Sequence, residues 1–263
     1  LIYVKADVVL LTFYGYVVQA GLYSSAYTII QLIFVFRSTL LSVLLPSLIN
    51  AYNTSLNDYK ERLGVYFRFG ALLGVVITGS LFFSNKFLII LLFGKEYLDS
   101  IIPLNILLVM NLVVFLNMGL SATLIVIKKD KEFLFATLIA AVINIFGNLI
   151  FIPAYNMIAA AVTTLCSELI IIIYSLILLQ SSKKEMDILR IFFKNNLNIL
   201  LVGLLSFGVT FCLNSIITNQ FNIDNLYIGL VFSSVFVVIF SGLVYALKLI
   251  TKKEIKIMTR VEE

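Results

Sequence analysis

The chain has 263 residues, of which 61% are hydrophobic and only 13% are charged, and its mean hydropathy is +1.08. A typical soluble domain carries about 25% charged residues, so this composition excludes an ordinary soluble protein. The net charge of +5 does not call for a nucleic-acid partner, because the positions of the cations have another explanation.

Long apolar segments follow one another along the whole chain. A helix that crosses a membrane needs about 20 mostly apolar residues. Segments of this kind lie near residues 2–19, 22–46, 66–92, 102–127, 133–153, 157–180, 195–217 and 226–250. We therefore predict an all-α, polytopic transmembrane bundle of about eight helices.

Short joints separate the predicted spans. The stretches 19–21 and 153–156 suit tight turns between antiparallel helices. Gly94 suits a helix C-terminus, and Pro103 suits the first turn of the next helix. Residues 50–65 form the longest polar loop that we predict.

The connections alternate between basic and almost uncharged along the chain. Sixteen of the 19 lysines and arginines fall on one predicted side. They are Lys5, Lys60, Arg62, Arg68, Lys128, Lys129, Lys131, Lys183, Lys184, Arg190, Lys194, Lys248, Lys252, Lys253, Lys256 and Arg260. Lys86 and Lys95 lie on the other side, and Arg37 lies inside a span. This positive-inside pattern predicts a membrane protein with both ends of this chain in the cytoplasm.

The start of the chain and its rare residues add two expectations. Leu1 already lies in an apolar run, so we expect a C-terminal fragment of a longer protein and no signal peptide. The chain has no histidine, no phosphate-binding loop and no nucleophile elbow. Cys166 and Cys212 lack metal-site spacing, so we expect free thiols, no metal and no cofactor. Transport is then a better expectation than enzymatic chemistry.

Arg37 is the cation that topology does not explain. It lies near the middle of the second span, where an arginine costs about 2.5–3.5 kcal/mol on insertion scales. One interpretation is a cavity cation that attracts an anionic substrate; the other is a structural pair or a snorkelling side chain. Gln31 and Ser38 form part of a polar stripe on the same helix, so Gln31 joins Arg37 as a substrate-binding candidate.

Two carboxyl groups within the spans are candidates for ion coupling. Glu168, near the centre of the sixth span, would titrate with a proton, bind sodium, pair with Arg37, or stay neutral and hydrogen-bonded. Asp7, two residues after Lys5, would form an interfacial ion pair or a coupling site.

Amide side chains recur at helical spacing. Asn144 and Asn148 share one face with Thr137 in the fifth span, and Asn117 shares a face with Ser121 in the fourth. These residues serve either as hydrogen bonds between helices or as substrate contacts.

Several stretches resemble one family of exporters. They are Asp7–Leu11, Ala20–Tyr27, Leu44–Leu48, Phe93–Tyr97, and 144–161 reaching Glu168. They resemble the C-terminal half of the O-antigen and capsule repeat-unit flippases, in the multidrug/oligosaccharidyl-lipid/polysaccharide exporter superfamily. Asn156 departs from the glycine that members often carry in this turn.

The resemblance implies a fourteen-helix transporter with two six-helix halves around a central cavity. Residues 1–182 would be the second half, and 183–263 two additional helices with a basic tail. The implied activity is flipping of an undecaprenyl-diphosphate-linked oligosaccharide to the periplasmic leaflet of the bacterial inner membrane. Implied partners are this lipid-linked substrate, membrane lipids, a proton or sodium ion, and a polymerase or chain-length complex, without nucleic acid. Arg37 would meet the diphosphate, and amide residues the sugars.

Three other functions remain open. A drug or metabolite antiporter of the same superfamily would depend on Glu168 or Asp7. A membrane-bound polysaccharide polymerase would carry a large outer loop, and the outer loops predicted here are short. A non-transporting scaffold would not need Arg37 or Glu168 within the membrane.

Overall fold

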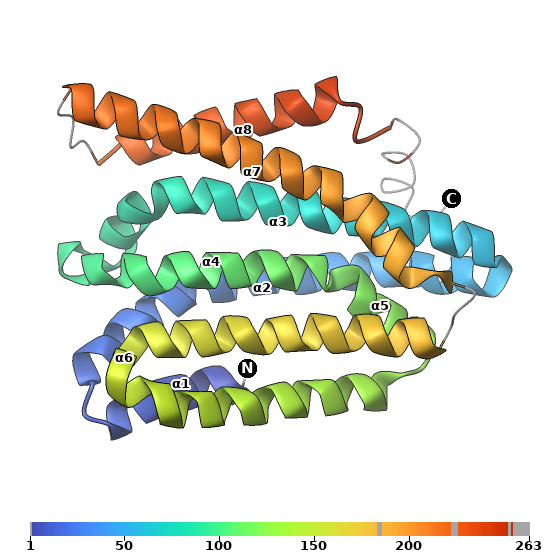
Figure 1. The fold of residues 1–263 in the computed structure, drawn as a ribbon, viewed down its shortest axis with the longest axis horizontal. Helices are drawn as coiled ribbons and strands as arrows, with labels where there is room; N and C mark the ends of the chain where they lie inside the picture. Colours follow the sequence, from blue (N-terminus) through green and yellow to red (C-terminus); the bar gives the residue numbers. More distant parts are fainter. Residues whose placement is uncertain (1, 183–185, 222–225, 252–253, 255–263) are drawn as a thin grey trace.

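The computed structural model describes residues 2–182, 186–221, 226–251 and 254, with side chains from Ala6 onward and none described at 219–221. The described part is helical, without strands (Figure 1). Its elements are α1 (Ile2–Phe13), α2 (Val17–Thr54), α3 (Leu56–Phe93), the 3-10 helix η1 (Lys95–Ser100), α4 (Ile101–Leu116), α5 (Met118–Val126), α6 (Asp130–Ser182), α7 (Ile188–Phe221) and α8 (Ile228–Ala246).

Six helical stretches of the described chain are long and apolar enough to cross a membrane. The protein is thus a multi-pass, all-α membrane bundle, and the predicted fold class is confirmed. The count of about eight spans stays a prediction. The helix α1 has only 12 residues, and α6 is a single 53-residue element that doubles back at Asn156 (Figure 1).

The connections gather at two ends of the bundle (Figure 1). The joints α2–α3, α5–α6 and α6–α7 and the segment after α8 lie at one end, which we call the basic end. The described cations of the basic connections are Lys60, Arg62, Arg68, Lys128, Lys129, Lys131, Arg190, Lys194 and Lys248. Lys183, Lys184, Lys252, Lys253, Lys256 and Arg260 lie outside the described residues. The two-sided charge pattern therefore matches the two ends of the fold.

Lys5 is an exception to this assignment. It lies in α1, nine residues before the turn at the opposite end, which is about 14 Å of helix. The short α1 therefore places Lys5 within the bundle and not at its basic end.

The first turn also lies elsewhere than predicted. The chain turns at residues 14–16, and the predicted turn at 19–21 is inside α2. Gly15 adopts φ +83°, a left-handed conformation that costs glycine little, whereas Gly21 is helical. The hydroxyls of Tyr14 and Tyr16 donate to the carbonyls of Leu149 and Pro153, at 3.2 and 2.9 Å. These bonds hold the turn against α6.

The predicted polar loop at 50–65 is wrong. The helices α2 and α3 have 38 residues each, and Ser55 alone separates them. The Ser55 hydroxyl accepts a hydrogen bond from the backbone N–H of Asn57 at 3.2 Å and so caps α3. Each helix is about 57 Å long, against about 30 Å of hydrocarbon, so their polar ends extend beyond the apolar layer.

Three other joints form as predicted. Gly94 ends α3 with φ +97°, and Pro103 lies in the first turn of α4. Asn156 makes the sharp turn within α6 at φ +45°, and its side-chain oxygen accepts from the N–H of Met157 at 2.7 Å. This local bond accompanies a positive φ, which is uncommon for residues other than glycine but is adopted by asparagine more often than by most.

The helix α3 is the centre of the packing, in contact with α2, α4, α7 and α8. Glycines allow this close approach. A Cβ atom on Gly79 would lie 2.2 Å from the ring of Phe236 in α8, and one on Gly229 would lie 2.4 Å from the carbonyl oxygen of Phe83. Close backbone contact of this kind drives helix association in lipid.

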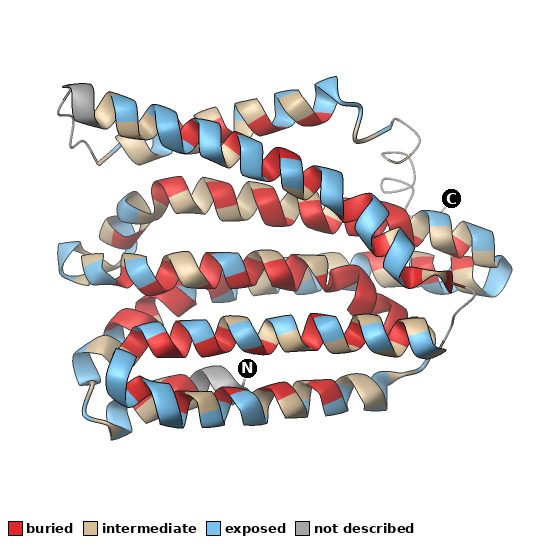
Figure 2. Ribbon diagram, in the orientation of Figure 1, coloured by how far each residue is buried: buried red, intermediate tan, exposed pale blue. Residues whose placement is uncertain are grey.

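Exposed residues follow the outer faces of the bundle (Figure 2), and many of them are large hydrophobic side chains. Phe146, Leu204 and Val238 are 61–71% exposed, as suits side chains that face acyl chains. Cys166 and Cys212 are exposed and unbridged, so the prediction of free thiols is confirmed.

The contact between α8 and α3 gives a test of this packing. We expect Gly229→Ala to destabilise the protein by about 1–3 kcal/mol, because its methyl group meets a backbone carbonyl that cannot move away easily. Thermal unfolding in detergent should show a lower Tm. Gly242→Ala is the control on the same helix, since nothing lies within 4 Å of its Cβ position. An equal Tm in both variants would contradict the packing described.

Candidate functional site

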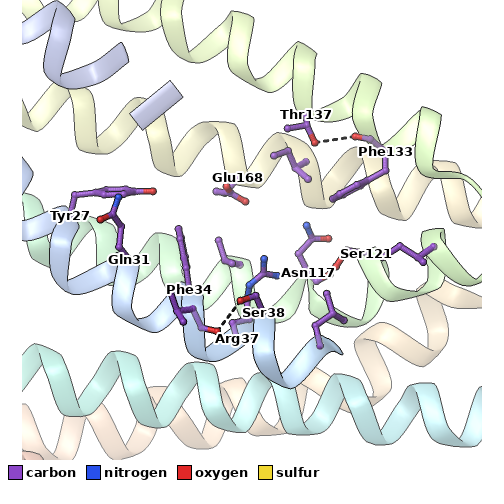
Figure 3. A pocket seen from close by; sticks show the side chains of 15 residues that line it. Tyr27, Gln31, Phe34, Arg37, Ser38, Asn117, Ser121, Phe133, Thr137 and Glu168 are labelled. Atoms are coloured by element: carbon purple, nitrogen blue, oxygen red, sulfur yellow. Dashed lines mark hydrogen bonds between the residues drawn. The ribbon is translucent and has the colours of Figure 1, made fainter. Parts of the chain in front are cut away.

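A cavity of about 650 Å³ lies between α2, the α4–α5 pair and α6 (Figure 3). Its lining combines one arginine and one glutamate with amides, hydroxyls and aromatic rings. The residues are Tyr27, Gln31, Phe34, Val35, Arg37, Ser38, Leu41, Val114, Asn117, Ser121, Ile125, Phe133, Thr137, Glu168 and Ile171. We call it the central cavity. Small-molecule sites typically have about 300–1,000 Å³.

The two charged residues come from facing walls of the central cavity. Arg37 projects from α2 and Glu168 from α6 (Figure 3). Both are held within a largely apolar bundle, where an ionised side chain is costly unless it meets water, a counter-ion or an anion. The lining of the cavity therefore includes one basic and one acidic side chain.

Asn117 contributes an amide at a break in the helix. It lies between α4 and α5, and its side chain is 5% exposed. Its Oδ1 has no hydrogen-bond partner among the described residues. A buried amide oxygen without a partner costs about 1–3 kcal/mol. Asn117 therefore places an unsatisfied amide oxygen in the wall beside the central cavity.

A second polar group lies beside the cavity and is centred on Asp7. The Asp7 side chain is fully buried and accepts three hydrogen bonds. The donors are the Tyr23 hydroxyl at 2.6 Å, the Asn148 amide at 2.5 Å and the Thr164 hydroxyl at 2.9 Å. These partners belong to α2 and to both arms of α6, so the Asp7 carboxyl joins three helices.

Two further residues complete what we call the Asp7 cluster. The Asn148 amide also donates to Asn144 Oδ1 at 3.2 Å, and the Asn144 amide donates to Thr164 Oγ1 at 3.3 Å. The Thr163 hydroxyl faces Asn148 Oδ1 at 2.5 Å. No lysine or arginine with a described side chain bonds to Asp7. Among the described residues, all the hydrogen-bond donors to the Asp7 carboxyl group are thus neutral.

The Asp7 cluster and the central cavity are neighbours along two helices. Tyr23 and Tyr27 are one turn apart on α2, with ring centroids 6.2 Å apart and stacked. Thr164 and Glu168 are likewise one turn apart on α6, which is about 6 Å. In each pair the first residue belongs to the cluster and the second lines the cavity.

The structure divides the predicted site residues between these two places. Arg37, Gln31, Asn117 and Glu168 line the central cavity. The other three, Asn144, Asn148 and Asp7, form the buried cluster instead.

The expectation that Asp7 lies at the membrane interface is wrong. Asp7 is fully buried, because α1 begins inside the bundle and packs against α2 and α6. The side chain of Lys5, its expected ion-pair partner, lies outside the described residues.

Tyr23, Thr163 and Thr164 were not predicted as site residues. The sequence gives only a weak signal for Tyr23: Tyr23 and Tyr27 recur at helical spacing, but at the start of the predicted span 22–46, where tyrosine also suits the membrane interface. Thr163 gives no such signal, because threonine hydroxyls commonly bond the backbone of their own helix, as Thr163 also does to Ala159 and Ala160.

The chemistry of the cluster is that of hard oxygen donors. A carboxylate, two amide oxygens and three hydroxyls suit a proton or a hard cation and do not suit zinc or iron. Among the described residues, no group of three or more His, Cys, Asp or Glu side chains is placed so that it could hold a metal ion. The chain matches no protein-family model, and no curated protein matches it.

A cysteine test distinguishes cavity surface from lipid-facing surface. In a Cys166→Ala, Cys212→Ala background, we expect Ser38→Cys to react with a membrane-impermeant thiol reagent at least about ten-fold faster than Leu204→Cys. Both positions are exposed, but Ser38 lines the cavity and Leu204 is on the outer face. Only a thiol in contact with water forms the reactive thiolate readily. Equal labelling rates would contradict an aqueous central cavity.

Proposed function

We propose that the chain is part of a transporter that flips an undecaprenyl-diphosphate-linked oligosaccharide across the bacterial inner membrane. The observation that carries this proposal is the central cavity, where Arg37 lies among amides, hydroxyls and aromatic rings. The process is translocation without chemical change of the substrate. The basic end faces the cytoplasm by the positive-inside rule, and the substrate leaves toward the periplasm.

The lining suits both parts of such a substrate. A diphosphate is a dianion, and a guanidinium binds phosphate oxygens through paired, charge-assisted hydrogen bonds. Gln31 and Asn117 offer amides to sugar hydroxyls, and Ser38 and Thr137 keep free acceptor lone pairs while donating to their own backbone. The aromatic rings provide flat apolar faces for the sugar rings.

The Asp7 cluster supports coupling of this transport to a proton or a sodium ion. An ionised carboxyl group buried in an apolar bundle needs compensation, and neutral donors supply only part of it. Binding of a cation supplies the rest and alters the bonds to Tyr23, Asn148 and Thr164. These residues belong to the helices that also carry Tyr27 and Glu168, so ion binding and the shape of the cavity are linked.

A second candidate function is export of a cationic drug or metabolite. Glu168 on the cavity wall favours it, because a carboxylate binds a cation where Arg37 would repel one. The two candidates assign opposite importance to these two residues, and single substitutions separate them.

Substitution of Arg37 tests the main proposal. We expect Arg37→Ala, in the full-length protein, to lower flipping by about 10–100-fold, the loss of one charge-assisted hydrogen bond to phosphate. The measurement is accumulation of repeat units on the inner-leaflet lipid carrier in a deletion strain that expresses the variant. Arg37→Lys is the control that keeps the charge and should retain part of the activity. Normal surface polysaccharide in the deletion strain itself would refute the flippase, and equal loss of protein and flipping would make Arg37 structural.

Substitution of Asp7 tests the coupling. We expect Asp7→Asn to abolish the dependence of transport on a sodium or proton gradient while the protein still reaches the membrane, because the amide keeps the size of the side chain and removes its charge. Transport by purified full-length protein in vesicles, with each gradient imposed in turn, measures this. Glu168→Gln is the matched control in the cavity. A gradient response that survives in Asp7→Asn and is lost in Glu168→Gln would move the coupling site to the cavity.

A further inference from the structure

A second hollow lies at the basic end, away from the central cavity. It measures about 410 Å³ and lies between the start of α3, the start of α7 and the segment after α8. Its lining holds four cations and three acids. The residues are Lys60, Glu61, Gly64, Val65, Arg68, Met186, Asp187, Arg190, Ile191, Lys194, Asn195 and Glu254. We call it the rim pocket.

The arginines of the rim pocket are already engaged by the protein. Arg68 forms an ion pair with Glu254, and its Nε donates to Asn195 Oδ1 at 2.8 Å. Arg190 faces Asp187 at 3.9 Å. The contacts of Arg68 connect α3 to α7 and to the segment after α8. Two of the three acids of the pocket, Glu254 and Asp187, are therefore paired with its arginines.

Lys60 and Lys194 differ from these arginines. Within the described residues neither has an ion-pair partner, and they approach the pocket from different helices, α3 and α7. An ammonium group is a compact charge with three donors, well suited to single phosphate oxygens. The rim pocket therefore carries an excess of positive charge where two helices meet.

The face of α7 that bears Lys194 becomes apolar toward the membrane interior. At 100° per residue, Leu201, Leu205 and Gly208 lie within about 60° of Lys194 on the helix. They border an apolar hollow of about 740 Å³, which begins about 10 Å along the helix from Lys194. Gly208 leaves it open, because nothing lies within 4 Å of its Cβ position.

We propose that the rim pocket binds the phosphate of an anionic glycerophospholipid, with an acyl chain along this face of α7. Basic pockets between helices at the cytoplasmic surface are suited to anionic headgroups. The apolar hollow favours a lipid over a soluble phosphate as the ligand, because it can hold an acyl chain. The bound lipid bridges α3 and α7 through Lys60 and Lys194. This site is independent of the transported substrate proposed above.

Binding of defined lipids to the purified full-length protein tests the site. Native mass spectrometry and Tm shifts compare phosphatidylglycerol with phosphatidylcholine of the same acyl chains. We expect phosphatidylglycerol to bind the Lys60→Gln, Lys194→Gln variant about 30-fold more weakly than the wild type, from the effect of two lysines near an anionic surface. The control is Lys128→Gln, Lys131→Gln, which removes the same charge from exposed positions in the α5–α6 connection and in the first turn of α6, at the same end.

Two further measurements distinguish a lipid phosphate from a soluble phosphate as the ligand. Glycerol phosphate should not compete at the concentration where the lipid saturates, and Gly208→Phe, which fills the apolar hollow, should weaken lipid binding even if the lysine variant does not fold. Equal weakening in the control variant, equal binding of phosphatidylcholine, or full competition by glycerol phosphate would each overturn the proposal.

Discussion

Helices in a bilayer gain little by burying apolar surface against one another, because lipid tails are as apolar as their side chains. This bundle therefore depends on close backbone contact and on buried hydrogen bonds. The glycines of α3 and α8 provide the contact, with no room for a methyl group at Gly79 or Gly229. The Asp7 carboxyl provides the bonds that hold the short α1 to α2 and to both arms of α6.

The polar groups of the bundle form two sites with different character. The Asp7 cluster is closed and its bonds are made within the protein, whereas the central cavity is open and leaves Asn117 Oδ1 without a partner in the described chain. The stacked pair Tyr23–Tyr27 and the helical turn from Thr164 to Glu168 connect them. A closed, internally bonded cluster and an open polar cavity thus lie one helical turn apart on the same two helices.

The sequence predicted the fold class well, because composition and the spacing of cations report directly on how the chain meets a bilayer. Gly94, Pro103 and Asn156 were predictable as joints, since their backbone preferences are local. The helical course of residues 50–65 was not, because Ser55 caps α3 within a polar stretch that has no apolar periodicity. The separation of Asn144 and Asn148 from Arg37 depends on where α1 packs, and no spacing within a single helix reports on that contact.

The turn at Asn156 leaves the two arms of α6 almost no connecting chain. Thr163 on the second arm packs against Gly147 on the first, at 2.9 Å from the Cβ position of Gly147, and its hydroxyl faces Asn148. Two arms joined so tightly have no slack in which to slide lengthwise past each other. The short turn and these contacts hold the two arms together as one hairpin, which carries Asn148 of the Asp7 cluster on its first arm and Glu168 of the cavity wall on its second.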